Sequence, residues 1–338
     1  MIKKFIKKRL TKYSKRHSII SQQDIQNSNT ILFSIFSRYG DGIISFKIIN
    51  EFIKKYPQKK YILLTSRQQI PYATKIITNK NIKFLKVNKY NPIELFKTVF
   101  YLKKSAYDLG FNPWGHGDDS EFFITYCKKF TFYKQCENFS KVHNLYDRVR
   151  SYLDLPIIKN KEIINPSFTK IKQILIAPIS TDITKNLSEE DTNLLLEQLK
   201  EKFNDVKIIL ALPKNNMMPN VNTKKFTFGK STSNSKQFLN TLLASDLFIG
   251  VDSGPLHLAM ALDIECIGIF GPTSPNTILD NNTKIKILRD NKLMSTFCFV
   301  RNCKKPICIN NIFNKNIFND NYKIGYNITL EETQCPIE

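Results

Sequence analysis

Short apolar runs alternate with longer segments of helical periodicity along most of this 338-residue chain. Because parallel strands need a long crossover connection, usually a helix, this rhythm predicts a parallel sheet covered by helices on both faces. In the first half we expect strands at 31–36, 61–64, 83–87 and 106–111. Helices are expected at 43–55, 93–104, 119–130 and 144–153, with a further helical stretch that follows the strand 61–64 and runs to about 78.

The same rhythm begins again after a polar stretch, 156–170, which we interpret as an interdomain linker. The second half is expected to hold strands at 173–177, 206–212, 246–250 and 264–270, and helices at 188–203, 235–244 and 255–262. Two doubly wound α/β halves predict a cleft between them, with ligands at the carboxyl ends of the strands. The predicted domains are 30–158 and 170–300, preceded by a basic segment, 1–17, and followed by a Cys-containing tail, 301–338.

The formal charge of +22, from 51 Lys and Arg against 29 Asp and Glu, suggests an anionic partner: nucleic acid, anionic lipid or a phosphorylated substrate. A nucleic-acid-binding protein should gather its basic residues on one surface or carry a reader motif. The lysines are instead spread along the chain without a zinc-finger, RRM or KH signature, so this class is disfavoured. A hydrophobic share of 42% and an aromatic share of 12% exclude a disordered chain.

Residues 1–16 carry eight basic residues and no acidic one, with apolar residues at helical spacing: Ile2, Phe5, Ile6, Leu10 and Tyr13. This is the pattern of a basic amphipathic helix that lies on an anionic membrane surface, and a solvated tail explains it equally well. No apolar run reaches the ~18 residues that a membrane span needs. Seven Cys without a secretory signal predict a reducing, cytoplasmic location, with peripheral attachment to an inner membrane as a further expectation.

Glycine is scarce, at 11 residues, and most of it falls into three clusters: Gly40 and Gly42; Gly110, Gly115 and Gly117; Gly250, Gly254, Gly268 and Gly271. Glycine permits a positive φ or a close approach of the backbone to a ligand. Each cluster is therefore a candidate site loop, with an ordinary turn as the alternative.

The third cluster lies in a strand–turn–helix segment, 244–275. The turn Asp252-Ser253-Gly254 precedes a helix in which Asp252 or Ser253 is a natural N-cap. The free N–H groups and positive dipole of such a helix start suit a phosphate or pyrophosphate. His257 lies one turn into the helix, on the side of the loop. The alternatives are an ordinary capped helix and a structural histidine.

Asp41 lies in the first glycine cluster, between a predicted strand and a predicted helix. A carboxylate at this place sits at the top of a parallel sheet. It could cap the helix, or it could accept a proton from a substrate hydroxyl as a general base.

Three motifs carry a resemblance to a known family: S-x-x-G-D at 37–41, D-S-G-P-x-H-x-A-x-A at 252–261 and F-G-P-T-x-P at 270–275. Together with YDLGF (107–111) and HNLYDRVRSYLDLP (143–156), they make the chain similar, over about 31–310, to the heptosyltransferases of glycosyltransferase family 9. Those are bacterial enzymes of lipopolysaccharide core assembly.

The resemblance implies a GT-B fold of two Rossmann-like domains that face each other across a cleft. It implies inverting transfer of heptose from ADP-heptose to a lipopolysaccharide core acceptor, a lipid-linked oligosaccharide, with no metal or other cofactor required. Asp41 would be the catalytic base. The donor would be held by Asp252, Ser253 and Gly254 at its diphosphate, by His257 beside them, and by Thr273 at the nucleotide.

The family also places a basic residue shortly after the strand at 173–177, and Lys185 is the matching position. This chain departs from the family around it, with Ala177-Pro178-Ile179 in place of a His-Pro-Gly-like run and Asn186-Leu187 in place of a Trp. A bystander lysine is the alternative.

The second glycine cluster adds Trp114, His116 and Asp118 as candidates for the acceptor side, because they follow the fourth predicted strand. A packed loop anchored by Trp114 is the alternative.

The tail holds Cys298, Cys303, Cys308 and Cys335, without the tight C-x2-C pairs of common zinc sites. A family subset that modifies autotransporter proteins is thought to bind iron through such cysteines, so a structural metal and free thiols are both open. Transfer of another sugar and heptosylation of a protein are the alternative activities.

Overall fold

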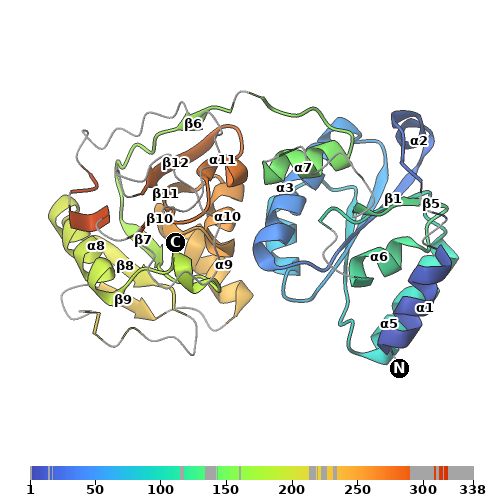
Figure 1. Cartoon of the computed structure of the whole chain (residues 1–338), viewed down its shortest axis with the longest axis horizontal. Helices are drawn as coiled ribbons and strands as arrows, with labels where there is room; N and C mark the ends of the chain where they lie inside the picture. The colour runs from blue at the N-terminus through green and yellow to red at the C-terminus, as the bar shows by residue number, and fades with distance from the viewer. Residues whose placement is uncertain are drawn as a thin grey trace, which may run out of the picture. The chain divides into compact units, whose positions relative to one another are not determined.

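The computed structural model describes residues 2–13, 16, 18–114, 118–133, 142, 144–159, 161–212, 218, 220–221, 227–230, 234–289, 308–309, 312–314 and 316–318. The chain divides into two compact units, Met1–Lys159 and Asn160–Glu338, which we call unit 1 and unit 2 (Figure 1). Each unit is built around one sheet.

Unit 1 contains a five-stranded sheet in the order β3-β2-β1-β4-β5, and all neighbouring strands are parallel. The chain winds outward from β1 to β3 and then returns to the other side of β1, which places a topological switch point between β1 and β4. The strands are β1 (Thr30–Ile35), β2 (Lys60–Thr65), β3 (Ile82–Lys86), β4 (Leu109–Phe111) and β5 (Lys129–Thr131). The helices are α1 (Ile2–Tyr13), α2 (Gln22–Asn27), α3 (Tyr39–Lys55), α4 (Ile70–Ile76), α5 (Pro92–Ser105), α6 (Asp118–Ile124) and α7 (Leu145–Tyr152).

The two faces of this sheet bury different side chains because successive strand residues point to opposite sides. On one face the ring of Phe33 packs against Phe52 of α3 and Phe111 of β4, with centroid distances of 5.7 and 5.8 Å. On the other face Leu32 joins an apolar cluster with residues of α1, α5 and α6. Figure 1 shows the same division, with α3 and α7 on one side of the sheet and α1, α5 and α6 on the other.

Unit 2 contains a seven-stranded parallel sheet in the order β6-β12-β11-β10-β7-β8-β9. Its switch point lies between β7 and β10. The strands are β6 (Ile163–Ile164), β7 (Gln173–Ala177), β8 (Lys207–Leu210), β9 (Thr227–Lys230), β10 (Leu247–Val251), β11 (Glu265–Ile269) and β12 (Thr283–Leu288). The helices are α8 (Glu189–Lys202), α9 (Ser235–Leu243), α10 (Gly254–Ala261), α11 (Pro275–Ile278) and two 3-10 turns, η4 (Ile183–Lys185) and η7 (Ile312–Asn314).

The predicted fold class, α/β with two Rossmann-like doubly wound units, is confirmed. Four details of the prediction are wrong. The helix expected over 119–130 ends at Ile124, and 129–131 forms strand β5 at the sheet edge. Strands β6 and β9 are two and four residues long, too short to show a period, and β12 was not expected. Gly40, Asp41 and Gly42 lie inside the first turn of α3 rather than in a turn before it.

An aspartate closes the amino edge of each sheet in the same way. In unit 1 the Asp108 carboxylate accepts hydrogen bonds from the N–H groups of Asn29 and Thr30, at 2.9 and 3.0 Å. In unit 2 the Asp246 carboxylate accepts them from Lys172 and Gln173, at 2.8 and 2.9 Å. Each aspartate directly precedes one strand of the switch-point pair and holds the start of the other.

Helix α1 forms as predicted, but its apolar side packs on unit 1. Ile6 is buried, and the ring of Phe5 meets Phe122 of α6 at a centroid distance of 5.6 Å. The Arg9 guanidinium donates hydrogen bonds to the hydroxyl and the carbonyl of Thr125, at 2.6 and 2.8 Å. Of the two interpretations of 1–17, the solvated tail is therefore wrong for α1. None of the described helices is long and apolar enough to cross a membrane.

Candidate functional site

Three of the residues predicted to bind a donor come together at the switch point of unit 2. Lys185 follows β7 in the turn η4, Asp252 follows β10, and His257 lies in α10. The ammonium of Lys185 lies 2.5 Å from Oδ2 of Asp252, and Nε2 of His257 lies 3.8 Å from Oδ1 of the same carboxylate. Lys185 was the donor-binding residue with the weakest support from the motifs. The structure places it in an ion pair with Asp252, which belongs to the strongest motif, 252–261.

This cluster is largely withdrawn from solvent. The exposed fractions of the side chains are 20% for Lys185, 5% for Asp252 and 8% for His257. Burial lowers the pKa of His257, the Asp252 carboxylate opposes this shift, and the Lys185 ammonium adds to it. The imidazole is therefore neutral near pH 7, and Lys185 is the cation that a phosphate would meet.

The start of α10 departs from the predicted cap. Ser253 occupies the N-cap position, but its hydroxyl donates to the carbonyl of Val251 at 3.0 Å and makes no capping bond to the helix. Gly254 and Pro255 are the first two helical residues. No side chain therefore caps the N–H groups at the start of α10. Uncapped N–H groups at the positive end of a helix dipole suit an anionic ligand.

The glycines near this edge serve close packing rather than a special backbone conformation, since no described glycine has a positive φ. A Cβ on Gly250 would lie 2.7 Å from the Phe248 ring and 3.0 Å from the carbonyl oxygen of Ala177. A Cβ on Gly271 would lie 2.9 Å from the side chain of Ile309 and 3.4 Å from Sγ of Cys308.

The loop after β11 opens at the same edge of the sheet, because β10 and β11 are in parallel register with Val251 opposite Ile269. It carries half-buried Thr273, the residue predicted for the nucleotide side, and buried Ser274. Arg289 directly follows the neighbouring strand β12 and is also buried. Arg289 was not predicted as a site residue because strand β12, which it follows, was not predicted.

Asp41 lies at the switch point of unit 1, as the third residue of α3 and shortly after β1. It is half-buried, and its backbone carbonyl accepts a hydrogen bond from the Ser45 hydroxyl at 2.9 Å. Arg38, not Asp41, holds the N-cap position, so the capping interpretation of Asp41 is wrong. A carboxylate in the first turn is nonetheless favoured by the helix dipole.

The loop after β4 contains the candidates for the acceptor side. Trp114 is 6% exposed and stacks on Tyr133 at a centroid distance of 6.1 Å, which makes it the anchor of a packed loop, as the alternative predicted. Asp118 begins α6. His116 lies outside the described residues.

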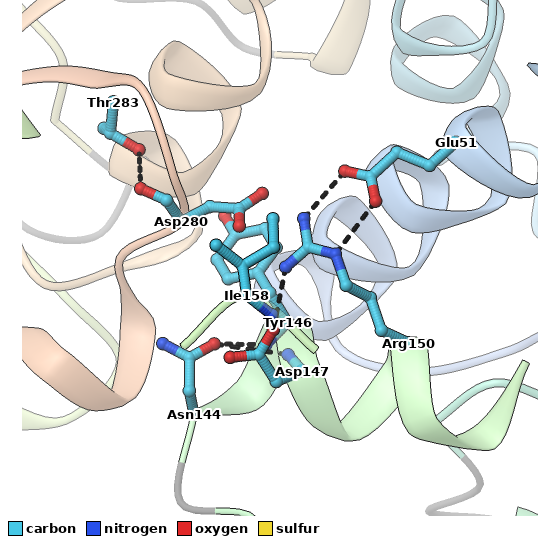
Figure 2. A network of polar contacts seen from close by, with 8 residues as sticks. All are labelled: Glu51, Asn144, Tyr146, Asp147, Arg150, Ile158, Asp280 and Thr283. Atoms are coloured by element: carbon cyan, nitrogen blue, oxygen red, sulfur yellow. Dashed lines mark hydrogen bonds and ion pairs between the residues drawn. The ribbon is translucent and has the colours of Figure 1, made fainter. Parts of the chain in front are cut away.

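A buried ion-pair network holds α3, the helix that carries Asp41 (Figure 2). The Arg150 guanidinium of α7 donates two hydrogen bonds to Glu51 of α3, at 2.8 and 2.9 Å, and one to Asp147 at 3.0 Å. Arg150 is only 2% exposed, so its charge needs these partners. The motifs in the sequence assign no role to Arg150; the signal that could have revealed it is the spacing of Asp147 and Arg150 at i, i+3.

The tail cysteines are mostly beyond what the structure describes. Cys298, Cys303 and Cys335 lie outside the described residues, and Cys308 is buried in the apolar cluster of unit 2. Within the described ranges, no three His, Cys, Asp or Glu side chains are grouped to hold a metal ion.

The fold is similar to that of known enzymes. The structure resembles the E. coli heptosyltransferase WaaC with ADP (13% identity, TM-score 0.59, 76% of this chain and 92% of that chain). It also resembles E. coli ADP-heptose lps heptosyltransferase II (15%, 0.59, 77% and 90%) and a family 9 glycosyl transferase from Veillonella parvula (12%, 0.57, 80% and 87%). A search of curated protein sequences gives no match.

The protein is a glycosyltransferase. Residues 146–308 match the model of glycosyltransferase family 9 (heptosyltransferase), so the resemblance drawn from the motifs is confirmed and the chain carries a domain of this family. The matched region includes Lys185, Asp252 and His257, whereas Asp41 lies outside it.

Proposed function

We propose that this glycosyltransferase moves heptose from ADP-heptose to a lipopolysaccharide core acceptor, with inversion at the anomeric carbon and without a metal ion. The observation that carries the proposal is the buried Lys185–Asp252–His257 cluster beside the start of α10, within the family 9 region. It supplies the two features that a diphosphate needs, a positioned cation and a helix dipole.

The donor diphosphate would lie between Lys185 and the first N–H groups of α10. The Asp252 carboxylate balances the lysine charge and fixes its position in the absence of a ligand. An ammonium has three donors, so Lys185 can keep its bond to Asp252 and also contact a phosphate oxygen. These donors would stabilise the charge that develops on ADP as it leaves, the electrostatic role that a metal has in other transferases.

Asp41 is proposed as the general base. The acceptor hydroxyl oxygen attacks the anomeric carbon and forms the new glycosidic bond, while the bond from that carbon to the ADP phosphate oxygen breaks. The hydroxyl proton passes to the Asp41 carboxylate, and the leaving electron pair stays on ADP. The Arg150–Glu51 pair acts on this step indirectly, because it holds α3 in place.

The proposed acceptor is a lipid-linked oligosaccharide on the cytoplasmic side of an anionic membrane. Two of the similar structures are named heptosyltransferases, and one of these is named an ADP-heptose lps heptosyltransferase. The excess of basic charge, +22, favours both an anionic acceptor and an anionic surface.

The test is release of ADP by the purified protein from ADP-heptose with a lipid A–core acceptor, measured beside UDP- and GDP-sugars. We expect acceptor-dependent release from ADP-heptose alone. The control is the same mixture without acceptor, which reports simple hydrolysis. Faster release from a UDP-sugar, or an equal rate without acceptor, would contradict the proposal.

A further inference from the structure

An exposed apolar ridge runs along one side of unit 1. It consists of Ile93, Phe96 and Phe100 of α5, which are 64%, 58% and 71% exposed, and Phe5 of α1. The rings of Phe5 and Phe96 are in contact across the two helices, at a centroid distance of 5.9 Å. Figure 1 shows α1 and α5 side by side at the edge of this unit.

The ridge is not left over from core packing. Leu95, Val99 and Leu102 already supply the buried face of α5. Ile93 and Phe100 are seven residues apart, so they lie above one another on the opposite side of the helix. Exposed large apolar side chains that form a contiguous patch mark an interaction surface.

Lysines flank the ridge on both helices. Lys97 and Lys104 follow Ile93 by four and eleven residues, and Lys8 and Lys12 follow Phe5 by three and seven, so each pair shares the ridge side of its helix. Neither pair forms an ion pair with a described carboxylate.

Two acidic residues of α5 and α6 are paired with basic residues outside the ridge. Glu94 of α5 is bound to Arg67 at 2.6 Å, and Asp119 of α6 is bound to Lys89. The ridge therefore presents aromatic and aliphatic groups within an uncompensated positive field.

We propose that this ridge, with Lys8, Lys12, Lys97 and Lys104, is the surface by which unit 1 binds an anionic lipid bilayer. Lysine is depleted at protein–protein interfaces, whereas lysine beside Phe and Leu is typical of helices that lie in the headgroup region. The ammonium groups can reach the lipid phosphates while their methylene chains cover the apolar boundary. The membrane itself is part of the proposed function, and the ridge gives it a binding surface that includes α5 as well as the N-terminal segment.

The experiment is sedimentation of the full-length protein with vesicles of phosphatidylcholine and phosphatidylglycerol, against vesicles of phosphatidylcholine alone. We expect binding to the anionic vesicles, weaker at high salt. Phe96→Ser with Phe100→Ser should reduce the partition coefficient at least about tenfold. Lys97→Ala with Lys104→Ala should reduce it about fivefold for each lysine removed.

Two controls keep the result specific. Leu243→Ser removes an exposed apolar side chain of unit 2, and Lys200→Ala with Lys202→Ala removes two exposed lysines of α8; both should bind vesicles like the wild type. Hydrolysis of the nucleotide-sugar donor in solution should be unchanged in every ridge variant, which separates failure of this inference from failure of the proposed function.

Three outcomes would overturn the inference: no binding of the wild type to anionic vesicles, unchanged binding of the phenylalanine variant, or equal loss in the unit 2 controls. A wild-type dimer that the phenylalanine variant abolishes, without vesicle binding, would instead identify the ridge as a contact between copies of the chain.

Discussion

The two units repeat one strand order and place opposite charges at the equivalent point. β1 of unit 1 corresponds to β7 of unit 2, since each lies beside the strand to which the chain returns after the switch. The turn after β1 leads to Asp41, and the turn after β7 leads to Lys185. One backbone plan therefore presents a carboxylate in one unit and an ammonium in the other, which suits a base in the first and an anion site in the second.

The second loop of each switch point differs more strongly. After β10 the chain places Asp252 within ion-pair distance of Lys185, so the two loops of unit 2 are joined by charge. After β4 the chain packs Trp114 against Tyr133, and the segments that follow β1 and β4 are joined by neutral bonds, such as that from the N–H of Phe36 to the hydroxyl oxygen of Ser120 in α6. The switch point of unit 2 thus contains a lysine, Lys185, held by an ion pair. The switch point of unit 1 contains Asp41, the acidic residue in the first turn of α3.

The largest effect is expected from Asp41→Asn, which keeps the shape of the side chain and removes its basicity. If Asp41 is the general base, kcat should fall about 10²- to 10⁴-fold with little change in donor binding. Steady-state ADP release and calorimetric titration with ADP measure the two quantities. Wild-type turnover in this variant would remove the proposed contrast between the units.

Lys185→Met should weaken ADP binding about 10- to 100-fold, because a charge-assisted hydrogen bond contributes about 1.5–3 kcal/mol. Lys200→Met, on the exposed side of α8, is the matched control. Loss of the ammonium also leaves the Asp252 carboxylate buried without its partner. The double variant with Asp252→Asn should recover the melting temperature but not the affinity; recovery of both would mean that Lys185 is structural.

Gly250→Ala should destabilise the protein by about 1–3 kcal/mol, since its Cβ would overlap the Phe248 ring and the Ala177 carbonyl. Gly42→Ala should cost less, because its Cβ would meet only the end of the Gln69 side chain, at 3.0 Å, and alanine favours the helix by about 1 kcal/mol. Urea unfolding of the two variants compares the glycine requirements of the units. Equal losses would contradict this ranking.

The smallest effect concerns His257, whose pKa is lowered in the folded protein chiefly by burial. The unfolded chain then binds the proton at a higher pH than the folded chain. The stabilising contribution of neutral His257 is complete above pH about 6.5 and is lost as the pH falls below it, with a slope of at most about 1.4 kcal/mol per pH unit. Unfolding free energies of wild type and His257→Gln between pH 7 and 5 test this; parallel curves would show that His257 does not contribute.

The sequence predicted the sheet plan because long elements carry a strong period. It also singled out the residues that come together as the candidate site of unit 2, because glycine and proline mark the turn before α10. It could not predict that the Ser253 hydroxyl turns back to Val251, since that choice depends on local geometry. Strand β12 was predictable, with Thr283, Ile285 and Ile287 buried on alternate positions. The Arg150–Glu51 pair was not, because its members are 99 residues apart.

A long separation in sequence also hid the packing of α1, since Arg9 and Thr125 are 116 residues apart. Its amphipathic pattern is correct, but the pattern does not say whether the apolar side meets lipid or protein. Ile6 and Arg9 are committed to unit 1, so deletion of 1–17 would damage the fold as well as any membrane contact. Point substitutions on the exposed ridge are the cleaner experiment.

Asp108 and Asp246 close the amino edges of the two sheets, at the end opposite to Asp41, Lys185 and Asp252. The amino ends of the central strands therefore hold the strands together, and the carboxyl ends of the same strands carry the candidate site residues. Loops at the carboxyl edge can change in length or charge while the amino edge keeps the strands aligned. Such a scaffold can acquire a new ligand by loop substitution alone, and its strand order is kept in structures that share only 12–15% identity with this chain.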